Sequence, residues 1–168
     1  MKYFLGKKYK DKIELEYDDL TLSDTKPDID EEICWGMDIK EINKYVNNEI
    51  TIYLENEDNK VIGFINFTIN KRKNAIVVNR LCSMKAYKGR GNGKKLLLTL
   101  IDIATNLGFE YISLIPKLDS KLKVVQFYRE IGFEPDEDLG LTFIYRLRPS
   151  SGGKTRRRRY NKKGTRRR

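Results

Sequence analysis

The stretch Tyr87-Lys88-Gly89-Arg90-Gly91-Asn92-Gly93-Lys94-Lys95 combines three glycines with four cationic side chains. Glycines at this density let successive backbone N–H groups turn toward one side of the chain, because no Cβ atom obstructs them. The residues that follow have a helical pattern, and the start of a helix adds unpaired N–H donors and the positive end of its dipole. The stretch therefore predicts a binding site for an anion such as a pyrophosphate.

The flanks of this glycine loop, which we define as residues 88–94, predict a strand before it and a helix after it. Residues 74–83 are rich in β-branched side chains, as strands are. Apolar side chains recur at helical spacing from Leu97 to Leu107, and Gly108 is typical of a helix end. Several nucleotide-binding designs share this order of elements, so the spacing of the glycines has to separate them.

Two common nucleotide-binding motifs do not fit the loop. A P-loop requires Gly-x-x-x-x-Gly-Lys-Ser/Thr, but Lys88 replaces the first glycine and Lys95 replaces the hydroxyl residue. A dinucleotide fingerprint, Gly-x-Gly-x-x-Gly, begins at Gly89 and Gly91 but has Lys94 at its last position. Both motifs are excluded.

The loop resembles the acetyl-CoA loop of the GNAT superfamily of N-acetyltransferases. The family pattern Gln/Arg-x-x-Gly-x-Gly/Ala is met at Lys88, Gly91 and Gly93, with lysine at the first position. A lysine keeps the positive charge that faces the pyrophosphate but lacks the planar fork of arginine. A tight basic surface turn is the alternative interpretation of the loop alone.

A second segment of the family pattern lies one predicted strand and one predicted helix further along. Residues 127–133, Phe-Tyr-Arg-Glu-Ile-Gly-Phe, match the signature Phe-Tyr-x-x-x-Gly-Phe that closes the cofactor-binding half of GNAT proteins. Residues 109–115 predict the intervening strand, and residues 121–131 predict a helix that ends at Gly132. The resemblance covers Val61 to Leu147 well and the preceding part of the chain loosely.

The resemblance implies an α/β (α+β) GNAT fold, in which a mixed, mostly antiparallel twisted sheet of about six to seven strands has flanking helices. It implies acetyl-CoA as cosubstrate and no metal. The sheet would splay at the strand before the loop, where the pantetheine arm pairs with free backbone groups, while the loop holds the pyrophosphate. The implied cofactor-binding residues are Leu81, Cys82, Ser83, Lys88, Gly89, Arg90, Gly91, Asn92, Gly93 and Lys94.

Tyr128 is the catalytic residue that the resemblance implies. Its hydroxyl would lie near the CoA sulfur and protonate the departing thiolate, since an unperturbed pKa of about 10 keeps tyrosine protonated at neutral pH. The alternative is an aromatic side chain packed in the core. The chain has no histidine, which excludes Cys–His and Ser–His pairs and histidine metal sites, so direct transfer to an amine is the economical mechanism.

The general base has no candidate at its usual family position. Several GNAT proteins keep a glutamate on the strand before the loop, where this chain has Val77, Val78 and Asn79. A lysine-like amine with a pKa of about 10.4 is neutral in only about one molecule in 2,500 at pH 7, so a base or desolvation is needed. The open alternatives are a water relay or one carboxylate among Glu55, Glu57, Asp119, Glu134, Asp136, Glu137 and Asp138.

The remaining segments predict the rest of the fold in less detail. Alternating apolar residues indicate strands at 12–17, 50–54, 63–69 and 141–147, with turns at 57–60 and 70–74. Residues 28–47 carry Ile39, Ile42 and Val46 at helical spacing behind an Asp cap.

The charge of the chain is concentrated at its C-terminus. Residues 151–168 hold three lysines and seven arginines without an acid, so the preceding 150 residues contain 24 basic and 24 acidic side chains. We therefore expect a GNAT domain at residues 1–147 and a disordered Arg/Lys-rich tail at 148–168. Binding to nucleic acid or to an import receptor is the leading use of such a tail, and improved solubility is the alternative.

Two hypotheses of function follow. The first is an N-acetyltransferase that moves acetyl from acetyl-CoA to a primary amine of a small molecule, a polyamine, a protein lysine or an N-terminus. The second is a non-catalytic CoA-binding GNAT-like module that presents the tail to nucleic acid. We expect an intracellular protein, in the cytoplasm or nucleus. Two cysteines without a small secreted scaffold indicate a reducing compartment, and the sequence shows no apolar stretch of membrane-spanning length and no signal peptide.

Overall fold

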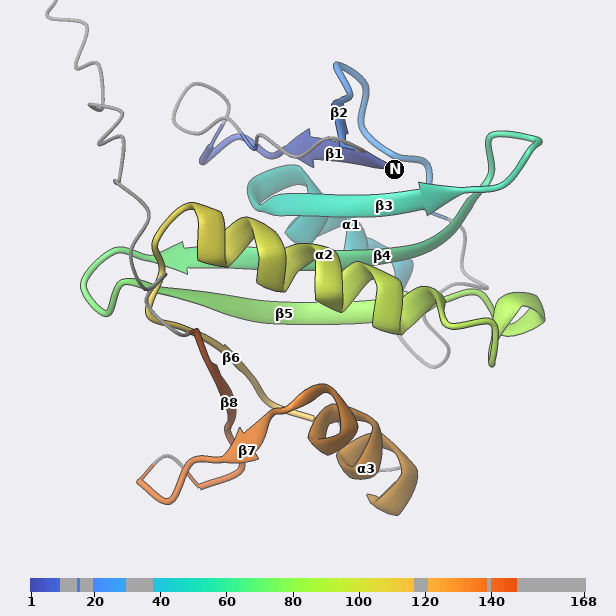
Figure 1. Ribbon diagram of the computed structural model, residues 1–168. Helices are drawn as coiled ribbons and strands as arrows, with labels where there is room; N and C mark the ends of the chain where they lie inside the picture. Colours follow the sequence, from blue (N-terminus) through green and yellow to red (C-terminus); the bar gives the residue numbers. More distant parts are fainter. Residues whose placement is uncertain (10–14, 16–19, 30–37, 117–120, 139, 148–168) are drawn as a thin grey trace, which may run out of the picture.

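The computed structural model describes residues 1–9, 15, 20–29, 38–116, 121–138 and 140–147. Its strands form one open sheet in the order β2-β1-β3-β4-β5-β6-β8-β7 (Figure 1). The pairs β1–β2 and β5–β6 are parallel and the other pairs are antiparallel. The strands are β1 (Lys2–Leu5), β2 (Thr21–Leu22), β3 (Ile50–Glu55), β4 (Val61–Asn70), β5 (Ala75–Ser83), β6 (Tyr111–Leu114), β7 (Glu134–Pro135) and β8 (Phe143–Arg146).

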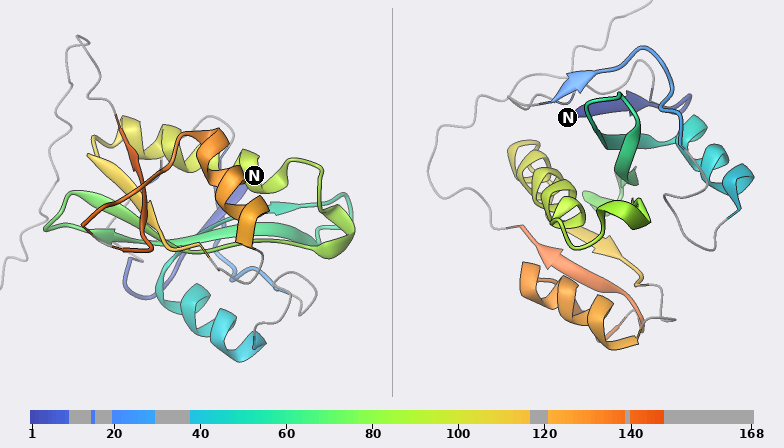
Figure 2. Two further views of the ribbon diagram at one scale, coloured as in Figure 1. Left: turned by 90° about the horizontal axis from the view of Figure 1, so that it is seen from below. Right: turned by 90° about the vertical axis from the view of Figure 1, so that its right-hand side faces the viewer.

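The helices cover both faces of the sheet and divide the core into two parts. The α-helices of the described residues are α1 (Ile39–Asn48), α2 (Asn92–Asn106) and α3 (Lys121–Ile131). Helices α2 and α3 lie on one face and α1 lies on the other (Figure 2). The larger core cluster packs α2 and α3 against the sheet, and the smaller cluster is centred on Ile42, Val46, Tyr53 and Phe64. This mixed, mostly antiparallel sheet with flanking helices confirms the predicted fold class.

The predicted elements nearest the glycine loop agree with the structure. The helix predicted at residues 121–131 has those bounds, and Gly132 follows it with a φ of +110°. The strands predicted at 50–54, 63–69 and 74–83 correspond to β3, β4 and β5. These segments combine a clear hydrophobic period with turn residues at their ends, which is why local sequence was sufficient.

The N-terminal predictions were less accurate. The helix predicted at 28–47 begins at Ile39, where the Asp38 carboxylate accepts a hydrogen bond from the Lys40 N–H at 2.8 Å. Asp28 and Ile29 are not helical, and residues 30–37, like most of the predicted strand at 12–17, lie outside the described residues. The sequence prediction also lacked β1, β2 and β7; β2 and β7 have only two residues each, which is too short for a period to be recognised.

The junction between α1 and β3 is fixed by close backbone contact with the segment after β1. The Gly6 N–H donates to the Glu49 carbonyl at 2.8 Å, and a Cβ added at Gly6 would lie 2.4 Å from the Glu49 nitrogen. Only glycine fits there, because backbone on both sides would have to move for a larger residue.

We expect Gly6→Ala to lower the free energy of unfolding by about 1–3 kcal/mol, because the methyl group overpacks a backbone contact. Urea denaturation followed by circular dichroism measures the change. Gly93→Ala is the control, since a Cβ there would make an ordinary 3.8 Å contact with Phe127. Equal stabilities would show that the junction relaxes around the methyl group.

Candidate active site

The glycine loop has a backbone conformation that requires glycine at two positions. Gly89 has a φ of +76° and Gly91 a φ of +80°, a region that costs an L-residue about 1–2 kcal/mol. A Cβ at either position would meet nothing within 4 Å, so the space beside the loop is open. The glycines are therefore needed for the path of the backbone, and that path leaves room for a ligand.

The start of α2 offers donors to an anion. Gly91 is its N-cap and provides no side-chain hydrogen bond, and the first turn contains no acidic residue. The first helical hydrogen bond runs from the Lys95 N–H to the Gly91 carbonyl at 2.9 Å, so the preceding N–H groups have no acceptor within the helix. Donors, the helix dipole and the Lys94 charge together fit a pyrophosphate.

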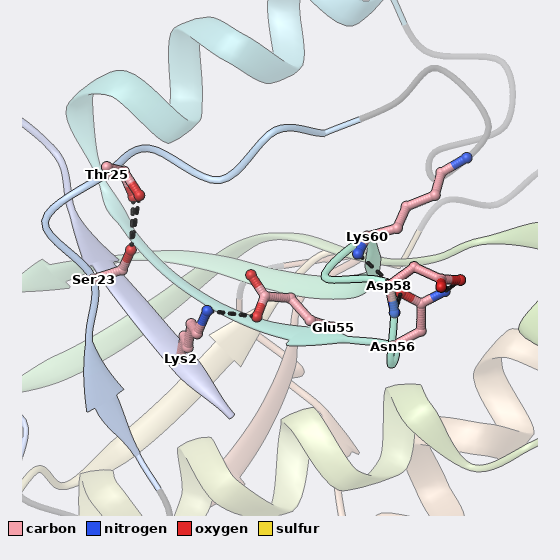
Figure 3. Close-up of polar contacts among 7 residues, drawn as sticks. All are labelled: Lys2, Ser23, Thr25, Glu55, Asn56, Asp58 and Lys60. Carbon is pink, nitrogen blue, oxygen red and sulfur yellow. Dashed lines mark hydrogen bonds and ion pairs between the residues drawn. The ribbon is translucent and has the colours of Figure 1, made fainter.

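The turn between β3 and β4 contacts Tyr87, the residue before the glycine loop, through Asn56. The side-chain oxygen Oδ1 of Asn56 accepts hydrogen bonds from the backbone N–H groups of Asp58 and Lys60, at 3.1 and 2.9 Å (Figure 3). The Asn56 amide lies 3.3 Å from the Tyr87 hydroxyl, and the Arg90 guanidinium stacks 4.9 Å from the Tyr87 ring centre. The turn thus holds Tyr87 in place, and the Tyr87 ring orients Arg90.

A cavity of about 460 Å³ separates this turn from the loop. Two acidic side chains, Glu57 and Asp58, contribute to its wall and disfavour a phosphate inside it. An anion is therefore favoured beside the first N–H groups of α2, whose first turn contains no acid, rather than beside the turn. The lining residues are Asn56, Glu57, Asp58, Ile62, Tyr87, Arg90 and Asn92.

The sheet opens between β5 and β6, as predicted for the strand before the loop. Parallel pairing joins Ala75–Val78 to Tyr111–Leu114 and ends there, while β5 continues to pair with β4 as far as Ser83. The edge of β5 from Leu81 to Ser83 therefore lies beyond the end of the pairing with β6 (Figure 1). Such an edge can accept an extended ligand as an added strand.

Cys82 combines this backbone position with a side chain on the opposite face from α2. It packs against the cluster that contains Ile42 and Val46 of α1, and its sulfur is disulfide-bonded. Its thiol is therefore not available as a nucleophile.

A β-bulge marks the point where the sheet opens. Asn66 pairs with Arg80 and Phe67 pairs with Val78, so Asn79 is an extra residue on β5. The bulge directly follows Val78, the last residue that pairs with β6. Bulges redirect side chains and are frequent beside functional sites.

Tyr128 lies on α3, on the same side of the sheet as α2. Its side chain is 9% exposed, and its ring makes edge contacts with Phe127 and Phe133 at centroid distances of 5.2 and 5.8 Å. Burial raises the pKa of Tyr128 to about 12. The Phe127 ring lies 3.8 Å from where a Cβ of Gly93 would be, so the structure brings the two sequence motifs together.

Glu49 is a buried carboxylate that the sequence analysis did not consider. It follows α1, is 7% exposed, and accepts a hydrogen bond from the Asn79 amide at 2.8 Å. Burial raises the pKa of Glu49, while the hydrogen bond from Asn79 and the charges of Lys8 and Arg80 oppose the shift. A sequence signal existed, since Glu49 is the only acid between Glu41 and Glu55.

The carboxylates considered earlier are placed less favourably for a base. Glu55 forms an ion pair with Lys2 at 2.7 Å (Figure 3), and Glu57 lies in the wall of the cavity beside the loop. Glu134, Glu137 and Asp138 are exposed in or after β7. Asp136 accepts a hydrogen bond from the Asp138 N–H in the same turn, and Asp119 lies outside the described residues.

The described residues contain neither a metal-binding cluster nor a helix suited to crossing a membrane. No group of three or more His, Cys, Asp or Glu side chains among them is placed to hold a metal ion. None of the helices in this part of the chain is both long and apolar enough to cross a membrane.

Solved structures similar to this one are acetyltransferases. The ribosomal-protein-S18-alanine N-acetyltransferase of Escherichia coli aligns with a TM-score of 0.56 and 18% identity, over 74% of this chain and 86% of its own. Tetrahymena GCN5 aligns with a TM-score of 0.55 and 20% identity, over 67% and 78%. A Bacillus anthracis protein assigned as a streptothricin acetyltransferase, solved with acetyl coenzyme A, aligns with a TM-score of 0.52 and 21% identity, over 63% and 68%.

The comparison of sequences supports the same family. No curated protein matches the chain. The model of the acetyltransferase (GNAT) family, however, matches residues 13–133, which include both the glycine loop and the segment around Tyr128. The splayed sheet, the glycine loop at the start of α2 and this match agree: the chain belongs to the acetyltransferase (GNAT) family.

Proposed function

We propose that this protein transfers the acetyl group of acetyl-CoA to a primary amine by direct attack. The observation that carries the proposal is the position of the opened edge of β5. It leads into the glycine loop at one end, and α3 brings Tyr128 to the same side of the sheet as that loop. The glycine loop, the part of β5 beyond its pairing with β6 and a buried phenol would thus serve one ligand.

The described residues fit acetyl-CoA in three ways. The N–H groups of Asn92, Gly93 and Lys94 would hold the pyrophosphate, because α2 begins there without a side-chain cap. The backbone of residues 81–83 would pair with the pantetheine arm. Lys88 and Arg90 would add positive charge within the loop. Acetyl-CoA supplies an activated thioester, so Tyr128 has only to donate a proton or hydrogen bond as the C–S bond breaks.

A combined binding and turnover experiment tests the proposal. Calorimetry with CoA measures binding without an acceptor, and thiol release from acetyl-CoA measures transfer to spermidine, to a lysine peptide and to peptides with different N-terminal residues. We expect micromolar CoA binding and amine-dependent thiol release. CoA binding without turnover on any amine would favour the non-catalytic alternative, and absence of CoA binding would exclude both.

A second function rests on the charge of residues 151–168. Ten cations and no acid in 18 residues would bind a polyanion, because arginine forks fit phosphates. We propose residues 148–168 as a nucleic-acid-binding tail attached to the catalytic domain. The proposal rests on the sequence alone, since these residues lie outside the described part of the chain.

The tail makes a measurable prediction about salt dependence. If all ten charges contact phosphates, the affinity of the full chain for duplex DNA falls with a log–log slope of about −9 against salt concentration. A variant that lacks residues 151–168 should lose this binding and retain acetyl transfer to a small amine. Fluorescence anisotropy between 50 and 300 mM salt measures the slope. Equal DNA affinity of the two proteins would contradict the proposal.

A further inference from the structure

A cluster of polar side chains lies on the face of the sheet that α1 covers. We call it the α1-face cluster; its members are Glu49, Thr51, Asn66, Asn79 and Arg80. They come from three neighbouring strands and the residue before β3, and the apolar residues that alternate with them belong to the core under α2 and α3. The cluster is therefore on the opposite side of the sheet from the glycine loop helix and Tyr128.

Two atoms of this cluster are buried without a hydrogen-bond partner among the described residues. They are the carbonyl oxygen of the Asn66 side chain and the Nε of Arg80, on residues that pair across β4 and β5. Asn66 is completely buried, and its amide nitrogen already donates to the Thr51 hydroxyl at 3.0 Å. A buried polar atom without a partner costs about 1–3 kcal/mol, so such atoms indicate a place where a ligand binds.

The bulge connects this cluster to the opening in the sheet. Asn79 is the extra residue of β5, directly after the last pair with β6, and its side chain contacts Glu49 on the α1 face. Residues 81–83, which we propose to hold the pantetheine arm, begin two positions after Asn79 on the same strand. The donor would enter from the α2 and α3 side and the acceptor from the α1 side.

We propose that Glu49 is the residue that binds the ammonium group of the acceptor and removes its proton, with Asn79 as the residue that positions it. The inference rests on the proposed acetyl transfer. Glu49 is suited to the role because its backbone is fixed by Gly6 and its carboxylate by Asn79. Its second carboxylate oxygen is left to accept from a ligand.

The proton balance requires such a group. Glu49 takes one proton from R–NH₃⁺, and the neutral nitrogen then attacks the carbonyl carbon, so that a C–N bond forms and the C–S bond breaks with its electron pair on sulfur. Tyr128 gives its proton to sulfur and is reprotonated by the second proton of the nitrogen. The third proton stays on the amide, and Glu49 releases its proton to water.

Burial and the charges around Glu49 act in opposite directions on its pKa. Lys8, which follows β1, and Arg80 on β5 stabilise the ionised carboxylate, and Glu41 of α1 is paired with Arg80 at 3.1 Å. Burial outweighs them and raises the pKa. The ionised form is the base, so activity should rise with pH through this pKa, above the ordinary glutamate value of about 4.3.

Glu49→Gln tests the proposal, because the glutamine oxygen can still accept from Asn79. We expect kcat/KM at pH 7 to fall about 100-fold, the typical contribution of a general base, with CoA affinity and thermal stability retained. Activity should recover as the pH approaches the pKa of the amine. Glu41→Gln is the matched control: it removes one carboxylate from the same face, where Glu41 is 48% exposed, and should keep near-parental kcat/KM at pH 7.

Each remaining outcome overturns the inference in a distinct way. Turnover of Glu49→Gln at the parental rate, or an equal loss in both variants, would show that Glu49 takes no proton. Lost CoA binding in Glu49→Gln would show that its role is structural. If the parent binds acetyl-CoA but acetylates no amine, then the proposed function itself fails, independently of Glu49.

Discussion

Gly91→Asp is expected to weaken CoA binding about a thousandfold while the protein remains folded. An aspartate at a φ of +80° costs about 1–2 kcal/mol, which the usual stability of a domain can absorb. Its carboxylate would lie beside the first N–H groups of α2, where it would cap them and repel a pyrophosphate. Lost donors and charge repulsion together amount to about 4 kcal/mol, or three orders of magnitude in affinity.

Gly108→Asp is the matched control for this variant. Gly108 has a φ of +75°, and a Cβ there would also meet nothing within 4 Å, but it follows the opposite end of α2. Both variants therefore carry the same strain and the same charge, and only Gly91→Asp changes the proposed pyrophosphate site. Calorimetry with CoA separates them. Equal affinity for CoA in the two variants would remove the glycine loop from the site.

The local sequence pattern explains why the elements proposed to bind acetyl-CoA could largely be predicted. In the glycine loop and in residues 127–133, positive φ angles require glycine, so the positions of the glycines predict the local backbone conformation. The strands β4 and β5 likewise have ten and nine residues, long enough for a period to appear. The family resemblance then supplied the order in which these elements combine.

The acceptor side was not predictable in the same way, because its contacts join residues far apart in the chain. Glu49 meets Asn79 only because Asn79 occupies a bulge, and a one-residue change of register would turn that side chain to the other face. Sequence reasoning looked for the base on the strand before the loop and found Val77, Val78 and Asn79. In our proposal Asn79 takes part as the hydrogen-bond donor that holds the Glu49 carboxylate, which comes from the residue between α1 and β3.

Tyr128→Phe is expected to lower kcat about a thousandfold with little change in CoA affinity. The substitution keeps the ring and its edge contacts with Phe127 and Phe133, and removes only the hydroxyl. Burial raises the pKa of Tyr128 to about 12, so the phenol is a weaker acid than an ordinary thiol and stays protonated until the thiolate forms. Desolvation also raises the pKa of a thiol, so the pKa values of Tyr128 and of a thiol buried beside it differ less than this comparison with an ordinary thiol suggests.

The raised pKa also predicts the shape of the pH profile. Tyr128 donates only while it is protonated, and a pKa of about 12 keeps it protonated throughout the range from pH 7 to 10. The parent should therefore show no alkaline decline of kcat in that range, whereas an unperturbed tyrosine would be half ionised at about pH 10. Tyr145→Phe is the control, because Tyr145 lies 5.3 Å from Phe133 in the same aromatic group. If Tyr128→Phe and Tyr145→Phe both turn over at the parental rate, then Tyr128 is a core residue and the thiolate leaves without it.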